Sequence, residues 1–365
     1  MYTIIGIVVI AAIVLLAVVL FMKQPSFGRL PQGERLERIK HSPNYRDGEF
    51  KNQHETVLMT SNGGRAKAIL NFLFKKDDNL RPTQEIPVIK TDLRKIDPEK
   101  NAIVWFGHSS YLMQIDRKRI LVDPVFCVAS PVSFVNKPFK GTDAYKPEDM
   151  PDIDYLVVTH DHWDHLDYQT IMQLKERVRK VICPLGVGEH FEYWGFEKDR
   201  IVELDWSEDG TLDTGFNIHC LPARHFSGRG LKANQSLWAS FLLESPSLKI
   251  YIGGDGGYDT HFADIGKRFR DIDLAILENG QYNEGWKYIH LMPQYMEQAV
   301  KDLNPKKVLT VHHLKYALAK HPWDEPTKNA LKMKKDLDCE VLIPQIGEVV
   351  ELKKGTQDND TILSL

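Results

Sequence analysis

The chain has 365 residues, of which 42% are hydrophobic and 27% are charged, and its formal net charge is −3. This is the balance of an ordinary globular protein, and the length suits one large domain or two modest ones. The absence of a basic excess argues against a nucleic-acid partner. The four cysteines form no Cys-x-x-Cys pair, which argues against a disulfide framework or a thiolate cluster.

Residues 2–22 carry no charge, and a helix of this length, at about 1.5 Å per residue, suits a bilayer core of about 30 Å. The alternative is a cleaved signal peptide. Three features argue against a signal peptide. No Lys or Arg precedes the run, the apolar stretch is too long for the hydrophobic region of a signal peptide, and no small-x-small cleavage site follows. We therefore expect residues 1–23 to be a single-pass transmembrane anchor. The positive-inside rule places the rest of the chain in the cytoplasm, because the basic residues that follow outnumber Glu34 and Glu37: Lys23, Arg29, Arg35, Arg38 and Lys40.

Residues 24–100 are polar, with one helical-looking patch at 65–76. We expect them to be a juxtamembrane extension that packs on the main domain. Residues 101–355 form that domain, and 356–365 a C-terminal tail. Short apolar runs in the main domain predict strands: AIVWFG (102–107), YLMQID (111–116), RILVD (119–123), DYLVV (154–158), KVICP (180–184), FNIHCLP (216–222), WASFLLE (238–244), LKIYIGG (248–254), LAILEN (274–279), KVLTVHH (307–313) and CEVLIP (339–344). Amphipathic stretches at 167–180 and 293–303 predict helices, so the pattern indicates one α/β layered domain.

The stretch THDHWDHLD, residues 159–167, directly follows the apolar run DYLVV. His160 and His162 are two residues apart after a strand, so an extended chain can direct both imidazoles to the same side. Asp164 and His165 follow as the chain turns into a helix, and they can point to a second position a few ångströms away. Two such pairs suggest two metal ions, each needing three or more protein ligands.

Further candidate ligands lie at the ends of other predicted strands. IHCLPARHFSG presents His225, and LKIYIGGDGGYD presents Asp255 among four glycines, which let a carboxylate approach a metal closely. KVLTVHHLKY presents His312 and His313. Each of these residues alone is ordinary, but imidazole and carboxylate groups at several strand ends of one domain favour metal ligation.

The 159–167 stretch resembles the His-x-His-x-Asp-His motif of the metallo-β-lactamase superfamily. This resemblance implies an αββα sandwich with the metal site along one edge. In this chain the sandwich would follow an N-terminal transmembrane helix. The chain is most similar to the branch of N-acylphosphatidylethanolamine-hydrolysing phospholipase D, over about residues 40–355. The segments that carry this similarity are SPNYRDGEFKN (42–52), VWFGHSSYLMQIDRKRILVDPVF (104–126), GGDGGYDTHFADIGKRF (253–269) and HLMPQYMEQAV (290–300).

The resemblance also implies roles for single residues. His160, His162 and His225 would hold one divalent metal. Asp164, His165 and His312 would hold the second, and Asp255 would bridge both. His312 is preferred over His313 because the family ligand directly follows the strand, although a swap of roles stays open. The His/Asp set fits zinc, and such sites also accept manganese or iron.

Two other histidines match the same family. His290, in YIHLMP, corresponds to a residue that contacts the substrate or stabilises the transition state, and together with Asp164 it is predicted to be catalytic. His108, in WFGHSS, either lies near the floor of the site or is an interior histidine that orders a loop. Trp286 and Tyr288 are predicted to bind substrate, and Trp163 and Trp194 are further aromatic candidates near the site mouth.

The predicted function is a membrane-associated hydrolase of phospholipase D type, acting on N-acylphosphatidylethanolamine-like lipids through a metal-bridging hydroxide. Its partners would be a phospholipid or another phosphodiester and the membrane, while the oligomeric state stays open. One alternative is a lactonase or a different phosphodiester hydrolase on the same site. Another is a non-catalytic, metal-bound scaffold, which the set of seven ligands disfavours because a structural site would not need an open bridging position.

Overall fold

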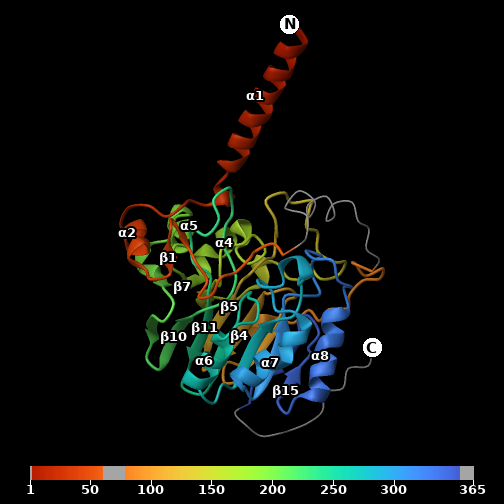
Figure 1. Ribbon diagram of the computed structural model, residues 1–365. Helices are drawn as coiled ribbons and strands as arrows, with labels where there is room; N and C mark the ends of the chain where they lie inside the picture. The colour runs from red at the N-terminus through yellow and green to blue at the C-terminus, as the bar shows by residue number, and fades with distance from the viewer. Residues whose placement is uncertain (1, 61–78, 354–365) are drawn as a thin grey trace.

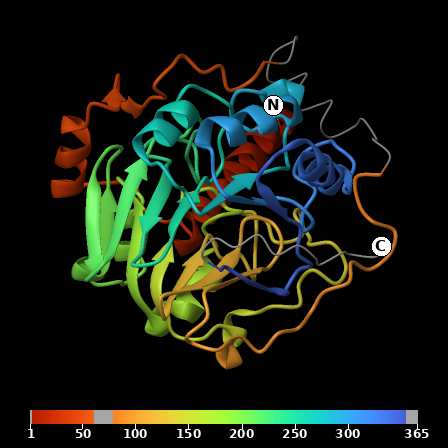
Figure 2. The same cartoon turned by 90° about the horizontal axis from the view of Figure 1, so that it is seen from below.

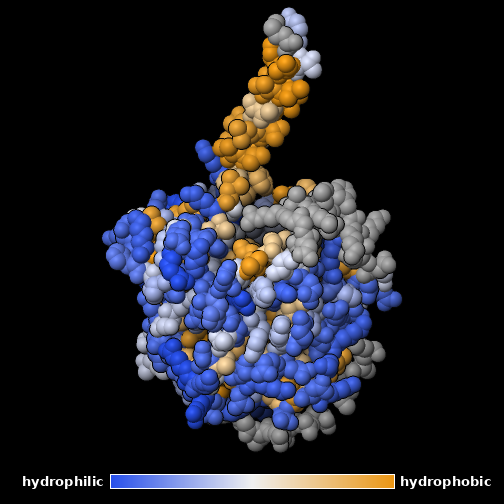
Figure 3. All heavy atoms as spheres, in the orientation of Figure 1, coloured by the Kyte–Doolittle hydropathy of each residue, from blue (hydrophilic) through white to orange (hydrophobic). Residues whose placement is uncertain are grey.

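The protein is described here by a computed structural model that covers residues 2–60 and 79–353. The predicted helical patch at 65–76 and the tail at 356–365 lie outside these residues. A 21-residue helix, α1 (Tyr2–Met22), projects from the domain, and none of its residues is buried. Figure 3 shows it as a hydrophobic column on a mostly hydrophilic body. By length and composition, α1 could cross a membrane.

Two mixed seven-stranded sheets make up the body of the domain. The order in the first is β16 (Val349–Glu351), β3 (Ala102–Trp105), β4 (Tyr111–Ile115), β5 (Lys118–Val122), β6 (Ile153–Val157), β7 (Val178–Pro184) and β8 (Ile201–Leu204). The order in the second is β15 (Glu340–Leu342), β14 (Lys307–Val311), β13 (Leu274–Glu278), β12 (Lys249–Ile252), β11 (Ser240–Glu244), β10 (Phe216–Leu221) and β9 (Asp209–Asp213). A short hairpin, β1 (Tyr45–Arg46) with β2 (Glu49–Phe50), stands apart from both.

The sheets face each other because their strands are apolar on both sides (Figure 2). In β5, Ile120 and Val122 enter the core between the sheets, whereas Leu121 points to the outer face. On the outer face of the first sheet lie α4 (Tyr168–Leu174) and α5 (Gly188–Tyr193). On that of the second lie α6 (His261–Arg268), α7 (Pro293–Leu303) and α8 (Glu325–Asp336). The predicted αββα sandwich is confirmed.

All eleven predicted strands are present, and the helix predicted at 293–303 is α7. The prediction of a helix over 167–180 extends too far towards the C-terminus. It ends at Leu174, and Val178 already begins β7, because Val178 and Val181 are buried as strand residues against α4. The pattern missed the hairpin strands β1 and β2, and it missed β8, β9 and β16, which are edge strands of the two large sheets. It also missed α2 (Gly33–His41), α5, α6 and α8.

The topology concentrates chain ends at one edge of the sandwich. Strands β5 to β8 run parallel in the first sheet, and β12 to β15 run parallel in the second. The carboxyl ends of parallel strands meet at the same edge, and loops there are free to carry ligand-binding side chains. Each predicted ligand follows the end of β6, β10, β12 or β14, and Figure 1 shows that this end of the domain also carries α1.

Candidate metal centre

A first cluster of three histidines, of which His160 and His225 are buried and His162 is half-buried, joins the loop after β6 to the loop after β10. His160 Nε2 lies 2.9 Å from His162 Nδ1, which lies 3.2 Å from His225 Nε2. Ligand nitrogens around a tetrahedral zinc ion are about 3.3 Å apart, since each Zn–N bond is about 2.0 Å. Burial, reinforced by the neighbouring imidazoles, lowers the pKa of all three rings. They therefore stay neutral, which is the state a metal requires.

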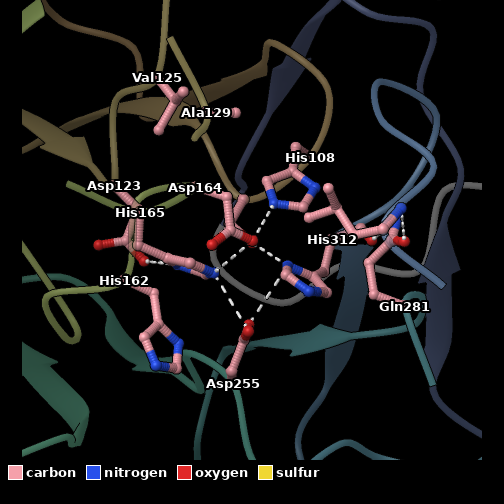
Figure 4. Close-up of polar contacts among 12 residues, drawn as sticks. His108, Asp123, Val125, Ala129, His162, Asp164, His165, Asp255, Gln281 and His312 are labelled. Carbon is pink, nitrogen blue, oxygen red and sulfur yellow. Dashed lines mark hydrogen bonds and ion pairs between the residues drawn. The ribbon is translucent and has the colours of Figure 1, made fainter. Parts of the chain in front are cut away.

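A second cluster combines carboxylate and imidazole groups from three loops (Figure 4). It consists of Asp164, His165, His312 and His108. His165 Nε2 lies 3.7 Å from Asp164 Oδ2, and His108 Nε2 lies 3.0 Å from the same oxygen. The two alternatives predicted for His108 are compatible with each other in this position. Its ring contacts Asp164, and its backbone N–H and C=O pair with the His312–His313 segment.

The Asp255 carboxylate touches both clusters. Its Oδ2 lies 3.1 Å from His165 Nε2 and 3.9 Å from His225 Nε2, and its Oδ1 lies 3.3 Å from His312 Nδ1. Gly257 allows the loop after β12 to pass close to the backbone of the 286–290 segment, because a Cβ at this position would lie 2.1 Å from the Tyr288 carbonyl oxygen. All seven predicted ligands thus converge on one region.

The buried polar atoms at the centre fit a cation. His165 Nε2 and Asp255 Oδ1 are buried and have no hydrogen-bond partner among the described residues. Burial disfavours charge on His165, but the carboxylates of Asp255, Asp164 and Asp123 outweigh this effect and raise its pKa. The carboxylates therefore favour positive charge at this point, which a divalent ion would supply more strongly than a proton.

A set of hydrogen bonds orients the rings from outside. His165 Nδ1 lies 2.8 Å from Asp123 Oδ2, and His225 Nδ1 donates to the Ile289 carbonyl oxygen at 2.6 Å. Such partners fix the tautomer and the direction of each ligand ring.

Sequence reasoning missed Asp123 and Glu278, although both carry the signal that found Asp255. Asp123 ends the apolar run RILVD, and Glu278 ends LAILE. Glu278 Oε2 accepts from His290 Nδ1 at 2.7 Å, while its Oε1 accepts from the Gly256 and Leu291 N–H groups. Burial raises the pKa of Glu278 to about 7. Burial also disfavours charge on His290, but Glu278 outweighs this effect and raises its pKa to about 9.

Four residues at the site adopt a backbone conformation that side chains usually avoid. His108, Asp123, Gln281 and His312 have φ of +53°, +40°, +57° and +68°. Each costs of order 1 kcal/mol or more and persists because the surroundings enforce it. The Gln281 side chain shows how: it accepts from the Leu318 and Ala319 N–H groups and donates to the His312 and Tyr316 carbonyl oxygens.

The structure separates the two adjacent histidines after β14. His312 lies in the second cluster, whereas the ring of His313 packs on Trp105 with 4.8 Å between centroids. Burial lowers the pKa of His313 to about 3. The geometry thus favours His312 as the ligand candidate.

The four aromatic residues that the sequence suggested near the mouth of the site differ in their surroundings. Trp286 Nε1 donates to the Gln281 carbonyl oxygen at 2.9 Å, and the Tyr288 ring lies 4.7 Å from the Arg224 guanidinium carbon. Trp194 is buried, and Trp163 lies between Phe27 and Arg229. The role of Trp286 and Tyr288 in substrate binding stays a prediction.

Comparison with known proteins identifies the family. A beta-lactamase superfamily domain matches residues 118–313, more than half of the chain. The chain belongs to this superfamily. It is 37% identical over 317 residues to an uncharacterized protein of Mycobacterium tuberculosis, covering 86% of this chain and 85% of that protein. It is 29% identical over 269 residues to the N-acyl-phosphatidylethanolamine-hydrolyzing phospholipase D 1 of Caenorhabditis elegans, covering 68% of this chain and 74% of that enzyme.

Among solved structures, a metallo hydrolase of Ignicoccus hospitalis matches with a TM-score of 0.53 and 20% identity, covering 70% of this chain and 99% of that one. This likeness shows the same fold. The superfamily membership and the clusters described above make the chain a metal-dependent hydrolase of metallo-β-lactamase fold. The resemblance drawn from the sequence is confirmed.

The loop that carries the metal motif, residues 159–167, is called the motif loop below. Through Arg229 it is connected to the segment that follows α1. The buried guanidinium of Arg229 donates through Nη1 to the Asp161 and Leu166 carbonyl oxygens at 2.9 and 2.7 Å. Through Nη2 it donates to the Ser26 carbonyl oxygen at 2.8 Å. Burial lowers the pKa of Arg229 to about 10. Because an unpaired buried cation is costly, Ser26 stabilises the arginine that holds the motif loop.

We expect Gly28→Ala to destabilise the protein more than a matched glycine change. Gly28 has φ +70°, and an added Cβ would lie 2.0 Å from His190 Nδ1. His190 Nε2 in turn lies 3.3 Å from Asp161 Oδ2 in the motif loop. Gly48 has φ +81° but no atom within 4 Å of an added Cβ, so Gly48→Ala carries the backbone cost of about 1 kcal/mol alone.

Overpacking should cost Gly28→Ala a further 1–3 kcal/mol or so. Denaturant unfolding of both variants in detergent measures the difference. Equal losses would show that the segment after α1 is not packed firmly on His190.

Proposed function

We propose that the protein is a membrane-anchored phosphodiesterase of phospholipase D type that acts on N-acylphosphatidylethanolamine-like lipids. The observation that carries this proposal is the Asp255 carboxylate in contact with both clusters, as a dinuclear centre requires. The similarity to the Caenorhabditis elegans enzyme supports the choice of substrate. The apolar helix α1 supports a membrane location. We further propose that the domain lies on the cytoplasmic side, on the basis of the basic residues that follow α1.

In this proposal His160, His162 and His225 hold one divalent ion, Asp164, His165 and His312 hold the other, and Asp255 bridges them. Zinc suits these donors, and manganese and iron are also compatible. Two such ions would lower the pKa of a bound water and polarise a phosphate. We assign residues 1–23 to the anchor, 24–100 to the extension, 101–355 to the hydrolase domain and 356–365 to the tail.

The chain's own residues would orient and stabilise the substrate. Asp123 keeps His165 turned towards the centre through its bond to Nδ1. Glu278 keeps a proton on His290 Nδ1, and the ring can then donate to a non-bridging phosphate oxygen. Trp286 and Tyr288 would contact the acyl chains through their rings.

The test uses the full-length chain in detergent or vesicles, loaded with zinc or manganese. The substrates are N-acylphosphatidylethanolamine, phosphatidylethanolamine, a lactone and bis-p-nitrophenyl phosphate. We expect release of phosphatidic acid from the N-acylated lipid. We expect this activity to be lost in His160→Ala and kept in His219→Ala, because the His219 ring on β10 pairs with Asp209 of β9. Turnover of the lactone alone would make the protein a lactonase, and no turnover at all would leave a metal-bound scaffold.

A further inference from the structure

One loop of the domain lies directly against the end of α1. A Cβ built on Gly230 would lie 3.5 Å from Met22 Cε, so the loop 228–232 meets the last turn of the helix. A cavity between this loop and the segment after α1 has Met22, Leu30, Leu231 and Lys232 in its wall. If α1 spans a bilayer, its apolar run ends at Met22, and the loop is at the depth of the membrane surface.

The segment that joins α1 to the domain is packed, which fixes where the domain sits. The Phe27 ring makes edge contacts with Phe21 of α1 and with Trp163 of the metal motif, with centroids 5.3 and 5.0 Å apart. The Pro25 carbonyl oxygen accepts from Trp194 Nε1 at 2.8 Å. The domain is thus held close to the end of the helix, and the motif loop is two ring contacts away from α1.

The side chains at this junction have the composition of a membrane interface. Leu231 is 88% exposed, more than any other large hydrophobic residue described outside α1. Leu30 is 46% exposed beside it, and Lys23 and Lys232 are also exposed. Apolar side chains enter the boundary of the acyl chains, while lysines remain among the headgroup phosphates.

We propose that the loop 228–232 is a membrane-docking surface, with Leu231 inserted in the bilayer that holds α1 and Lys232 at its headgroups. This inference rests on the anchoring of α1 in the proposed function. It adds that the domain is seated on the lipid in one orientation. Docking would present the metal motif to the surface, so a phospholipid would move only a short way to reach it.

The depth of Leu231 can be measured directly in the full-length chain. We would introduce Leu231→Cys in a background with the accessible Cys127 and Cys339 changed to serine, and label the new thiol with the fluorophore NBD. The control is Leu331→Cys, which is 42% exposed on α8, far from α1 (Figure 1). The proteins are placed in vesicles of phosphatidylcholine and phosphatidylglycerol, and flotation verifies that α1 is inserted.

We expect blue-shifted emission at position 231 that is quenched by spin-labelled lipid, and aqueous emission at 331. Water-like emission at both positions in protein that floats with the vesicles would overturn the docking proposal while α1 stays anchored. Failure to float would instead contradict the anchoring, and with it the docking. Both results are independent of catalysis.

A second arm connects docking with turnover. Leu231→Glu should lower turnover of vesicle lipid about tenfold and leave bis-p-nitrophenyl phosphate turnover unchanged. Leu331→Glu should change neither rate. Equal vesicle rates in the two variants would contradict a role of the loop in reaching lipid. Loss of soluble turnover in Leu231→Glu would point to damage of the fold and would also contradict the docking role.

Discussion

Replacing Asp255 by alanine is expected to lower turnover about a thousandfold or more and to reduce the metal content below two ions per chain. The carboxylate is the group that faces both clusters, at 3.9 Å from His225 Nε2 in the first and 3.1 Å from His165 Nε2 in the second. Loss of a bridging ligand removes several kcal/mol of charge stabilisation in the transition state, and each 1.4 kcal/mol is a factor of ten in rate. Elemental analysis and turnover are measured on the same purified sample.

The control for this change is Asp264→Ala on α6, a carboxylate whose side chain is 71% exposed. It should keep both the metal content and the rate of the unaltered protein. Two ions per chain together with unaltered turnover in Asp255→Ala would refute the bridging role. One ion per chain in the unaltered protein, even after zinc or manganese loading, would refute the dinuclear centre itself.

The convergence of the seven ligand candidates could be predicted because it follows from chain direction. Each candidate follows the end of β6, β10, β12 or β14, and the parallel strands β12 to β14 place Asp255 and His312 at the same edge of their sheet. A local pattern is enough to find such residues. The edge strands β8, β9 and β16 were missed for two reasons: β8 (IVEL) and β16 (VVE) are short, and β9 (DGTLD) is polar, with one buried residue.

The support for the motif loop could not be predicted in the same way. Arg229 and Ser26 are 203 residues apart, and the arginine contacts backbone carbonyl oxygens, which every residue has. No residue type marks such a contact in advance. Arg35 gives a second example. It follows α1 and is one of the basic residues used above to orient the helix in the membrane. Its buried guanidinium nevertheless pairs with Glu189, Glu192 and Glu203 on the domain.

The basic residues after α1 can therefore have two roles, packing on the domain and setting the orientation of the helix in the membrane. Some of them contribute to packing of the domain, and this would select for arginine whichever side of the membrane the domain occupies. Lys23 is exposed beside α1, so under the positive-inside rule it still indicates that the domain lies on the cytoplasmic side. Sidedness is better measured by protease access in sealed vesicles than argued from the charge count.

The second large effect is expected at His290, where alanine should lower turnover about a hundredfold or more while both metals and the fold remain. Its Nδ1 is 2.7 Å from Glu278 Oε2 and 3.9 Å from Asp255 Oδ2, so Glu278 is its nearest partner. Glu278 is itself fixed by two backbone N–H groups. A ring held this way can act as a donor to the substrate, and loss of one such donor typically costs a factor of a hundred to a thousand.

The alternative is that His290 is an eighth ligand, since it also falls in a group with Asp255, Glu278 and His312 whose atoms could hold an ion. Metal content separates the two roles: a donor leaves it unchanged, whereas a ligand lowers it. His261→Ala is the control, because His261 is a buried histidine on α6 that packs against Phe262. We expect that variant to keep its rate. If His290→Ala keeps full metal and full activity, the ring neither binds metal nor contacts substrate, and its bond to Glu278 serves only to order the 286–290 segment beside His225.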